Sequence, residues 1–235
     1  MPTPHGRPYS LPGVLIALLL LPAALPGAGR GETDQPGVRL PVPPEALPAN
    51  YQEAVRRVLA SPTLSVRAEG EAFHSPAELY HWLLDHPDRV SLAWQRIGVG
   101  CLEILSRPDG QFRWRDGQGT EVVWRTIARG EHGRVWYAHG QARAGALLPA
   151  VPARAVAVLW HRTGLDEQGR PVVRHQLDLY LQTDSKAARL VARMLGPAAP
   201  RLAEDGAQQL LMFFSGIARY LARHPEQTRE LLAPQ

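Results

Sequence analysis

Histidines are the residues of this chain whose types and placement could most directly support chemistry, because imidazole serves as acid, base and metal ligand. His139, His161 and His175 fall in three successive segments of alternating sequence. On one shared face of a sheet, three imidazoles would form the ligand set of a catalytic zinc site. Their spacing is not local, however, and only His175 lies in phase with a buried face. We therefore predict a hydrogen-bonded His175 and no metal site.

The other polar motifs predict turns and caps, not a catalytic set. Asp85 and Asp88, like the pair 166–167, stand at chain breaks, where aspartate hydrogen-bonds to the backbone. Ser215 is followed by a glycine but lacks the glycine-flanked elbow of nucleophilic serines. We assign no catalytic residue, no cofactor and no metal from the sequence.

The first 29 residues have the pattern of a secretory signal peptide. Arg7 precedes an apolar run over 11–25, and the small residues 27–29 follow. An uncleaved anchor would need about 20 apolar residues, and this run is shorter and interrupted by Pro22. We expect cleavage after Gly29, a periplasmic or extracellular protein, and no membrane span in the mature chain.

Composition predicts one domain behind this leader. Residues 30–48 are rich in proline and are expected to form an extended, disordered linker. Residues 49–235 are enough for a single domain with a substantial core. Cys101 is the only cysteine, so an internal disulfide is impossible.

The charge pattern does not predict a nucleic-acid partner. The net charge is +4, and Lys186 is the only lysine. The arginines are spread along the chain and alternate with acidic residues, whereas nucleic-acid binding needs a clustered basic face.

Periodicity predicts an α+β domain. Helical spacing is expected over 50–59, in two short helices within 76–97, over 186–195, and in a long helix over 200–223 with one apolar stripe. Period-two alternation predicts a strand over 63–73 and a meander of antiparallel strands over 101–182, the clearest being 172–182. The expected fold is an antiparallel sheet of about six to seven strands curved around the long C-terminal helix.

This order of elements resembles the helix-grip superfamily, which includes the START lipid-transfer domains and the polyketide cyclase-like proteins. The resemblance covers about residues 63–223. Its local support is the stretch Ser75-Pro76, Leu79 and Trp82-Leu83-Leu84-Asp85, followed by Trp94. It is similar to the segment after the first strand of that superfamily, where a helix leads into a Leu-x-Asp element and a tryptophan.

The resemblance implies a cavity between sheet and helix that holds an apolar or amphipathic small molecule, such as a lipid. The candidate wall residues are Trp114, His175, Leu177, Leu179, Phe214 and Ile217. These side chains could equally pack against one another without a void, because every domain must bury a core. Two other function classes stay open: a protein-interaction module, and a cyclase or hydrolase with His175 as acid or base.

Overall fold

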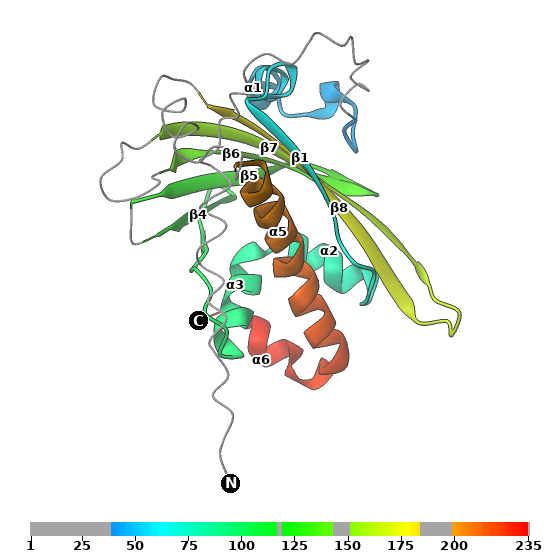
Figure 1. Cartoon of the computed structure of the whole chain (residues 1–235). Coiled ribbons are helices and arrows are strands. Elements are labelled where there is room, and N and C mark those ends of the chain that lie inside the picture. The colour runs from blue at the N-terminus through cyan, green and yellow to red at the C-terminus, as the bar shows by residue number, and fades with distance from the viewer. Residues whose placement is uncertain (1–38, 117–118, 143–150, 184–198, 235) are drawn as a thin grey trace.

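The computed structural model describes residues 39–116, 119–142, 151–183 and 199–234 (Figure 1). One antiparallel sheet curves around a long C-terminal helix, which confirms the predicted α+β class and its helix-grip-like arrangement. The sheet has eight strands, where six to seven were expected. Two of the eight, β2 and β3, contain only two residues each, too few for alternation to show in the sequence.

The strands form a meander in the order β1-β8-β7-β6-β5-β4-β3, and β2 continues β1 along the edge of β8. Neighbouring strands are antiparallel throughout. Their bounds are β1 Leu64–Glu69, β2 Phe73–His74, β3 Leu105–Ser106, β4 Gln111–Arg115, β5 Glu121–Gly130, β6 Gly133–Ala142, β7 Val151–Leu165 and β8 Pro171–Thr183.

The predicted helices within the described residues are also present. Their bounds are α1 Ala49–Ala60, α2 Ala77–Asp85, α3 Pro87–Arg96, α5 Ala199–Arg223 and α6 Thr228–Leu232, with the short 3-10 turns η3 Pro44–Ala46 and η5 Pro225–Gln227. The helix expected over 186–195 lies outside the described residues. Within the described ranges, no helix combines the length and the apolar character needed to cross a bilayer.

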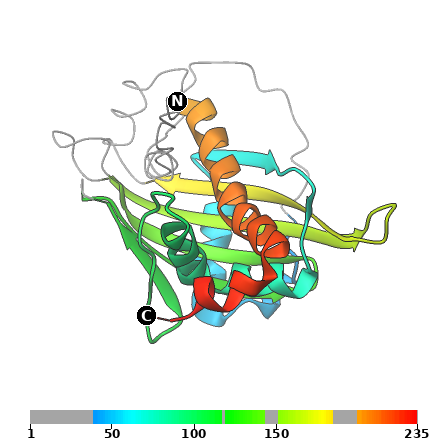
Figure 2. The same ribbon diagram turned by 90° about the horizontal axis from the view of Figure 1, so that it is seen from below.

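Helix α5 lies on the concave side of the sheet, as Figures 1 and 2 show. Its main strand contacts are with β1, β2 and β8, and it also packs on α2 and α3. The apolar stripe predicted from the sequence faces inward, since Phe214, Ile217 and Leu221 are buried. These contacts place the larger of the two hydrophobic cores between α5 and the concave face.

The convex side of the sheet carries a second core, built by the N-terminal segment. Leu47 and the α1 residues Val55 and Val58 pack there on β5, β6 and β7. Pro41 crosses the β5–β6 turn so closely that a Cβ on Gly130 would lie 2.8 Å from the Pro41 carbonyl oxygen. Residues 39–48, expected to belong to a disordered linker, are therefore part of the domain. Proline content indicated an extended chain but not the apolar contacts that hold it.

Candidate functional site

The concave face changes character along rows of side chains that run across the strands. The register places the members of one row on β4, β5, β6, β7, β8 and β1 in turn: Phe112, Trp124, Ala138, Ala155, Leu181 and Leu64. The next row runs, from β5 to β1, through Thr126, Trp136, Ala157, Leu179 and Val66. Each row therefore has aromatic residues toward β4–β6, alanine in the middle and branched aliphatic residues on β8 and β1.

The aromatic end is held in place by contacts within the sheet and with α5. The Trp136 indole Nε1 donates a hydrogen bond to Thr126 Oγ1 at 3.1 Å, which satisfies the polar atom of a buried ring. Phe214 of α5 stacks on the Trp136 ring at a centroid distance of 5.7 Å. The rings of Phe112 and Trp124 meet at the same centroid distance, 5.7 Å, across β4 and β5. These contacts fix the positions of the rings on the concave face.

Small residues form a strip along β6 and β7 between the aromatic and aliphatic ends. The register pairs members of this strip directly, and the strip comprises Ala138, Gly140, Ala153, Ala155 and Ala157. Side chains this short project less from the sheet than the tryptophans or leucines on either side, and Ala153, Ala155 and Ala157 are buried. A molecule lying along the strip would have indole rings on one flank and α5 on the other.

One polar side-chain atom of α5 is shielded and unpartnered. The side-chain oxygen Oε1 of Gln209 is shielded from solvent and has no hydrogen-bond partner among the described residues. Gln209 lies one helical turn before Phe213, whose ring contacts Phe214 edge-on. A shielded amide oxygen without a donor is energetically unfavourable, so this position suits a ligand group that carries an O–H or N–H.

The structure places all six predicted wall residues in the buried concave core, but not around one space. Leu177, Leu179 and Ile217 belong to the part of the concave face that lies beneath α5 and carries aliphatic side chains, which we call the aliphatic half. Trp114 lies on β4 in the other part, over β4 to β6, which carries the aromatic side chains and which we call the aromatic half. Phe214 connects the two halves through its stack on Trp136. His175 lies toward the far end of β8, in a separate polar cluster.

That cluster consists of His161 and His175 on neighbouring strands and Tyr80 and His81 on α2. His161 and His175 are direct cross-strand partners. The Tyr80 hydroxyl lies 2.6 Å from His175 Nδ1, and His81 Nε2 lies 3.3 Å from His161 Nδ1. His161 Nε2 is buried and has no hydrogen-bond partner among the described residues. The cluster joins α2 to the end of the β7–β8 pair.

Burial keeps this cluster uncharged at neutral pH. It lowers the pKa of His161 to about 4, with a further contribution from the positive charges that His81 and Arg134 can carry. It likewise lowers the pKa of His175 to about 4, with help from Arg219. The pKa of Tyr80 is raised well above its usual value, again by burial. Neither histidine is tuned near neutral pH, where a general base works best.

The convergence of three strand histidines that the sequence left open does not occur. His139 is exposed and lies on the convex face, where its ring contacts Tyr137. Only His161 and His175 share the concave face. Within the described ranges, no group of three or more His, Cys, Asp or Glu side chains is arranged to hold a metal ion.

His175 is also enclosed sterically. A Cβ added to Gly70 would lie 2.1 Å from His175 Nε2, so the ring fills the space that a side chain at position 70 would occupy. Phe73 closes a further side of the ring at a centroid distance of 5.1 Å. The cluster therefore reads as a structural lock between α2, β2 and β8, and the aromatic half of the concave face is the better candidate site.

Several residues of the site were not identified from the sequence. Trp124 and Trp136 fall in the segment predicted as a meander, but they, Ala155 and Gln209 carry no local signal of a site. The β4–β5 and β5–β6 pairings could have placed the two tryptophans on one face, once the register was known. Tyr80 meets His175 across 95 positions of sequence, a contact that no local pattern encodes.

No family model matches this sequence, and no curated protein matches it either. Among solved structures, a conserved protein from Geobacillus kaustophilus is similar at 12% identity and a TM-score of 0.40, covering 67% of this chain and 93% of that one. An uncharacterized protein from Rhizobium leguminosarum (13% identity, TM-score 0.32) covers 64% and 93%. A truncated norcoclaurine synthase from Thalictrum flavum (12%, TM-score 0.31) covers 63% and 93%. Similarity this distant carries no functional argument, and START membership in particular has no support from it.

Proposed function

We propose that this protein binds an apolar or amphipathic small molecule between the aromatic half of the concave face and α5. The observation that carries the proposal is the strip of small residues on β6 and β7, flanked by Trp124 and Trp136 and faced by Phe214. Small-molecule sites are lined mainly by apolar and aromatic side chains with a few polar groups that fix orientation. The strip, the indoles and Gln209 supply that combination.

The same arrangement defines the chemistry of the ligand. Indole and phenyl faces favour flat or aliphatic bodies, which gain from leaving water by about 25 cal/mol per Å² of apolar surface. The unpartnered Gln209 Oε1 would accept a hydrogen bond from a hydroxyl or amide group. A lipid alcohol, a sterol or a hydroxylated aromatic molecule has both parts.

The geometry favours binding over catalysis. The histidine that an enzyme of this architecture would use, His175, is engaged by Tyr80 and enclosed by Gly70 and Phe73. Its pKa of about 4 makes it a weak base at neutral pH. The buried polar cluster and the strip of small residues also lie at different positions along the strands.

A thermal-shift screen of fatty alcohols, sterols and polyaromatics tests the proposal. A ligand that binds only the folded state adds about 2.7 kcal/mol to the free energy of unfolding at a hundred times its dissociation constant. We expect at least one class to raise the midpoint of wild-type protein. Ala155→Leu fills the strip and should abolish that rise while leaving a folded protein.

The matched control is Ala54→Leu, the same substitution on α1 at the opposite face of the sheet. It should preserve the ligand-induced rise. If no apolar compound raises the wild-type midpoint, or if the rise survives Ala155→Leu, the proposal fails.

We further propose that the protein is exported and that its mature chain begins near Arg30. The support is the apolar run over 11–25 followed by small residues, a pattern in the sequence alone. N-terminal sequencing of protein from the exported fraction should give a start near Arg30. An intact Met1, or protein confined to the cytoplasm, would contradict export.

A further inference from the structure

A second candidate site lies on the other side of the molecule, at the free end of the β7–β8 hairpin, which extends beyond the rest of the sheet (Figure 1). There β2 pairs with β8 through Phe73↔Val173 and His74↔Val172. An open groove of about 390 Å³ follows this pairing, and its lining includes Ala72, His74, Arg162, Leu165, Val172 and Arg174. None of the residues that line the groove belongs to the strip of small residues or to the tryptophans beside it.

Two arginines give this groove its charge. Arg162 and Arg174 are direct cross-strand partners, and both are exposed. Neither forms an ion pair or side-chain hydrogen bond with another described residue. Like charges placed directly opposite each other on a sheet are destabilising, so the pair carries a cost that the free protein does not offset locally.

The carboxylate in the lining cannot neutralise these arginines, because other groups already hold it. Asp166 accepts hydrogen bonds from the backbone amides of Gln168 and Arg170 and from the Arg170 side chain, and His74 Nε2 lies 2.8 Å from its Oδ2. The Arg170 amide and His74 hold the pKa of Asp166 well below its usual range. The groove therefore keeps an excess of positive charge.

The lining also contains apolar residues, among them Ala72 and Val172. Val172 pairs with Gly164 and with His74, so its side chain lies on the same face of the hairpin as the two arginines. Guanidinium groups pair with carboxylate and phosphate oxygens through two parallel hydrogen bonds. An oxyanion attached to a short apolar body would match both parts of the groove.

We infer that the groove between β2 and the β7–β8 hairpin binds a small organic anion, with Arg162 and Arg174 on its carboxylate or phosphate and Val172 and Ala72 on its apolar body. This site is independent of the ligand proposed for the concave face. Each could exist without the other.

Calorimetric titration of the full-length protein with hexyl phosphate and hexanoate tests the inference, with hexanol and inorganic phosphate as reference compounds. We expect one-to-one binding of the two amphipathic anions that weakens as salt is raised. Each reference compound supplies only half of the recognition and should bind at least tenfold more weakly.

Arg162→Gln and Arg174→Gln should each weaken hexyl phosphate binding roughly tenfold or more, as expected for loss of a charged hydrogen-bonding partner. The control is the double variant Arg107→Gln/Arg223→Gln, which removes two exposed charges elsewhere and should leave affinity within twofold. Ala155→Leu should also leave it unchanged, which separates this groove from the concave site.

Thermal unfolding without any anion provides a second readout. Because the two arginines repel each other, Arg162→Gln should unfold at the same temperature as wild type or higher. Equal affinity of wild type and Arg162→Gln for hexyl phosphate would overturn the inference. Equal binding of hexanol and hexyl phosphate would overturn it as well.

Discussion

The two halves of the concave face use the same backbone for different purposes. Under α5, the rows end in Leu64, Val66, Leu179 and Leu181, and the polar groups nearby are engaged by Tyr80 and His175. Over β4 to β6, the same rows contain Phe112 and Trp124 in one case and Thr126 and Trp136 in the other, and both continue through alanines. The aliphatic half is lined by leucines and a valine, whereas the aromatic half combines large rings with short side chains.

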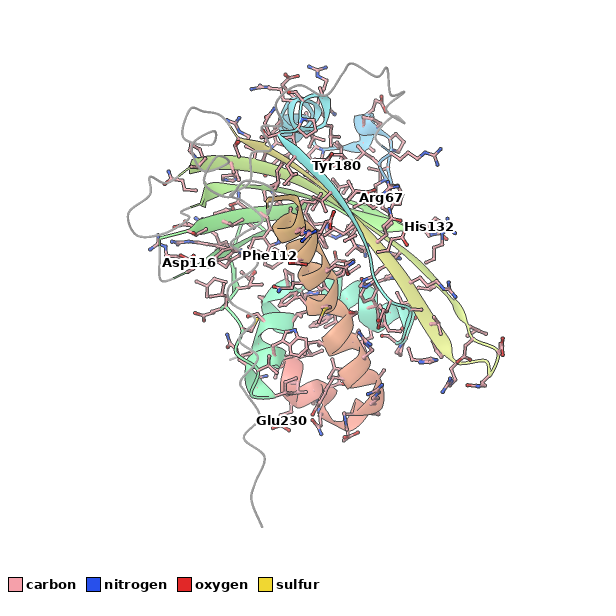
Figure 3. All side chains as sticks on the ribbon, in the orientation of Figure 1. Arg67, Phe112, Asp116, His132, Tyr180 and Glu230 are labelled. Atoms are coloured by element: carbon pink, nitrogen blue, oxygen red, sulfur yellow. The ribbon has the colours of Figure 1, made fainter. Side chains whose placement is uncertain are left out.

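This difference distinguishes a region built only for stability from one whose small residues suit a ligand. A domain that needed nothing but stability could place larger residues at 138, 155 and 157, since filled interiors are the norm. The convex side serves as a further comparison, because Tyr180 there packs against the core that the N-terminal segment builds, and Arg67 lies on the same side (Figure 3). Arg67 forms a two-bond pair with the buried Asp178, which in turn accepts from the Trp160 indole.

The largest expected effect comes from the residue that joins the two halves. Phe214 is 3% exposed and contacts both Trp136 and Phe213. Phe214→Ala should lower the free energy of unfolding by about 3–5 kcal/mol, the range for deleting a buried phenyl ring. Urea unfolding measures it. Met212→Ala, at a position 54% exposed on the same helix, should change stability by less than about 0.5 kcal/mol; similar losses in both variants would contradict the assigned helix face.

The next effect is a dependence of stability on pH that arises in the buried polar cluster around His161 and His175. Burial lowers the pKa of His161 and His175 to about 4 in the folded protein, against about 6.5 in an unfolded chain. Below pH 6.5 the two histidines bind protons in the unfolded chain but stay neutral in the folded chain. The free energy of unfolding should therefore fall between pH 6.5 and 4, by about 3 kcal/mol for each histidine.

Urea unfolding at several pH values in that window measures the slope. His161→Leu removes one titrating group and its unpartnered nitrogen, so the slope of the variant should be clearly shallower than that of wild type. An identical slope in the two proteins would show that His161 is not the buried neutral group described above.

A smaller effect tests how tightly the lock is closed. Gly70→Ala places a methyl group where it meets His175 Nε2, so the imidazole must move and its contact with Tyr80 must weaken. Overpacking of this kind costs about 1–3 kcal/mol. Gly164→Ala is the control, because a Cβ there meets no atom within 4 Å, and it should be neutral. Equal thermal midpoints for both variants would mean that the ring is free to move.

The smallest effect on stability is expected in the aromatic half. Ala155→Leu would cost about 1–3 kcal/mol in a filled core. Because Ala155 has Ala138 and Leu181 as its row neighbours, we expect the variant to lose less than about 1 kcal/mol in urea unfolding. A larger loss would place Ala155 in a packed interior and remove the room that a ligand needs.

The sequence predicted the parts of the fold that are buried on one face only. Alternation over 172–182 correctly predicted that Val173, His175 and Leu177 of β8 face the core. It failed on β6, where Val135, Trp136 and Tyr137 are all buried. The N-terminal segment covers the convex face there, so both faces are apolar and no alternation remains to show that His139 points away from His161 and His175.

The candidate site was harder to predict than the fold for a related reason. Its floor is made of alanines on β6 and β7. They matter because their side chains are short, and a short apolar side chain gives no signal of a site in the sequence. Its neighbours are set by strand register, which links residues far apart in the chain. Gln209 lies in the predicted α5 helix, but that its Oε1 lacks a partner follows only from packing.

Titration with the neutral fluorescent probe N-phenyl-1-naphthylamine tests the central claim most directly. If the aromatic half of the concave face is a binding site, wild-type protein should bind the probe saturably at one to one and transfer tryptophan fluorescence to it from Trp124 and Trp136. Ala155→Leu should fold normally and bind at least tenfold more weakly, while Ala54→Leu behaves as wild type. Absence of saturable binding by wild type, or undiminished binding by Ala155→Leu, would contradict the account.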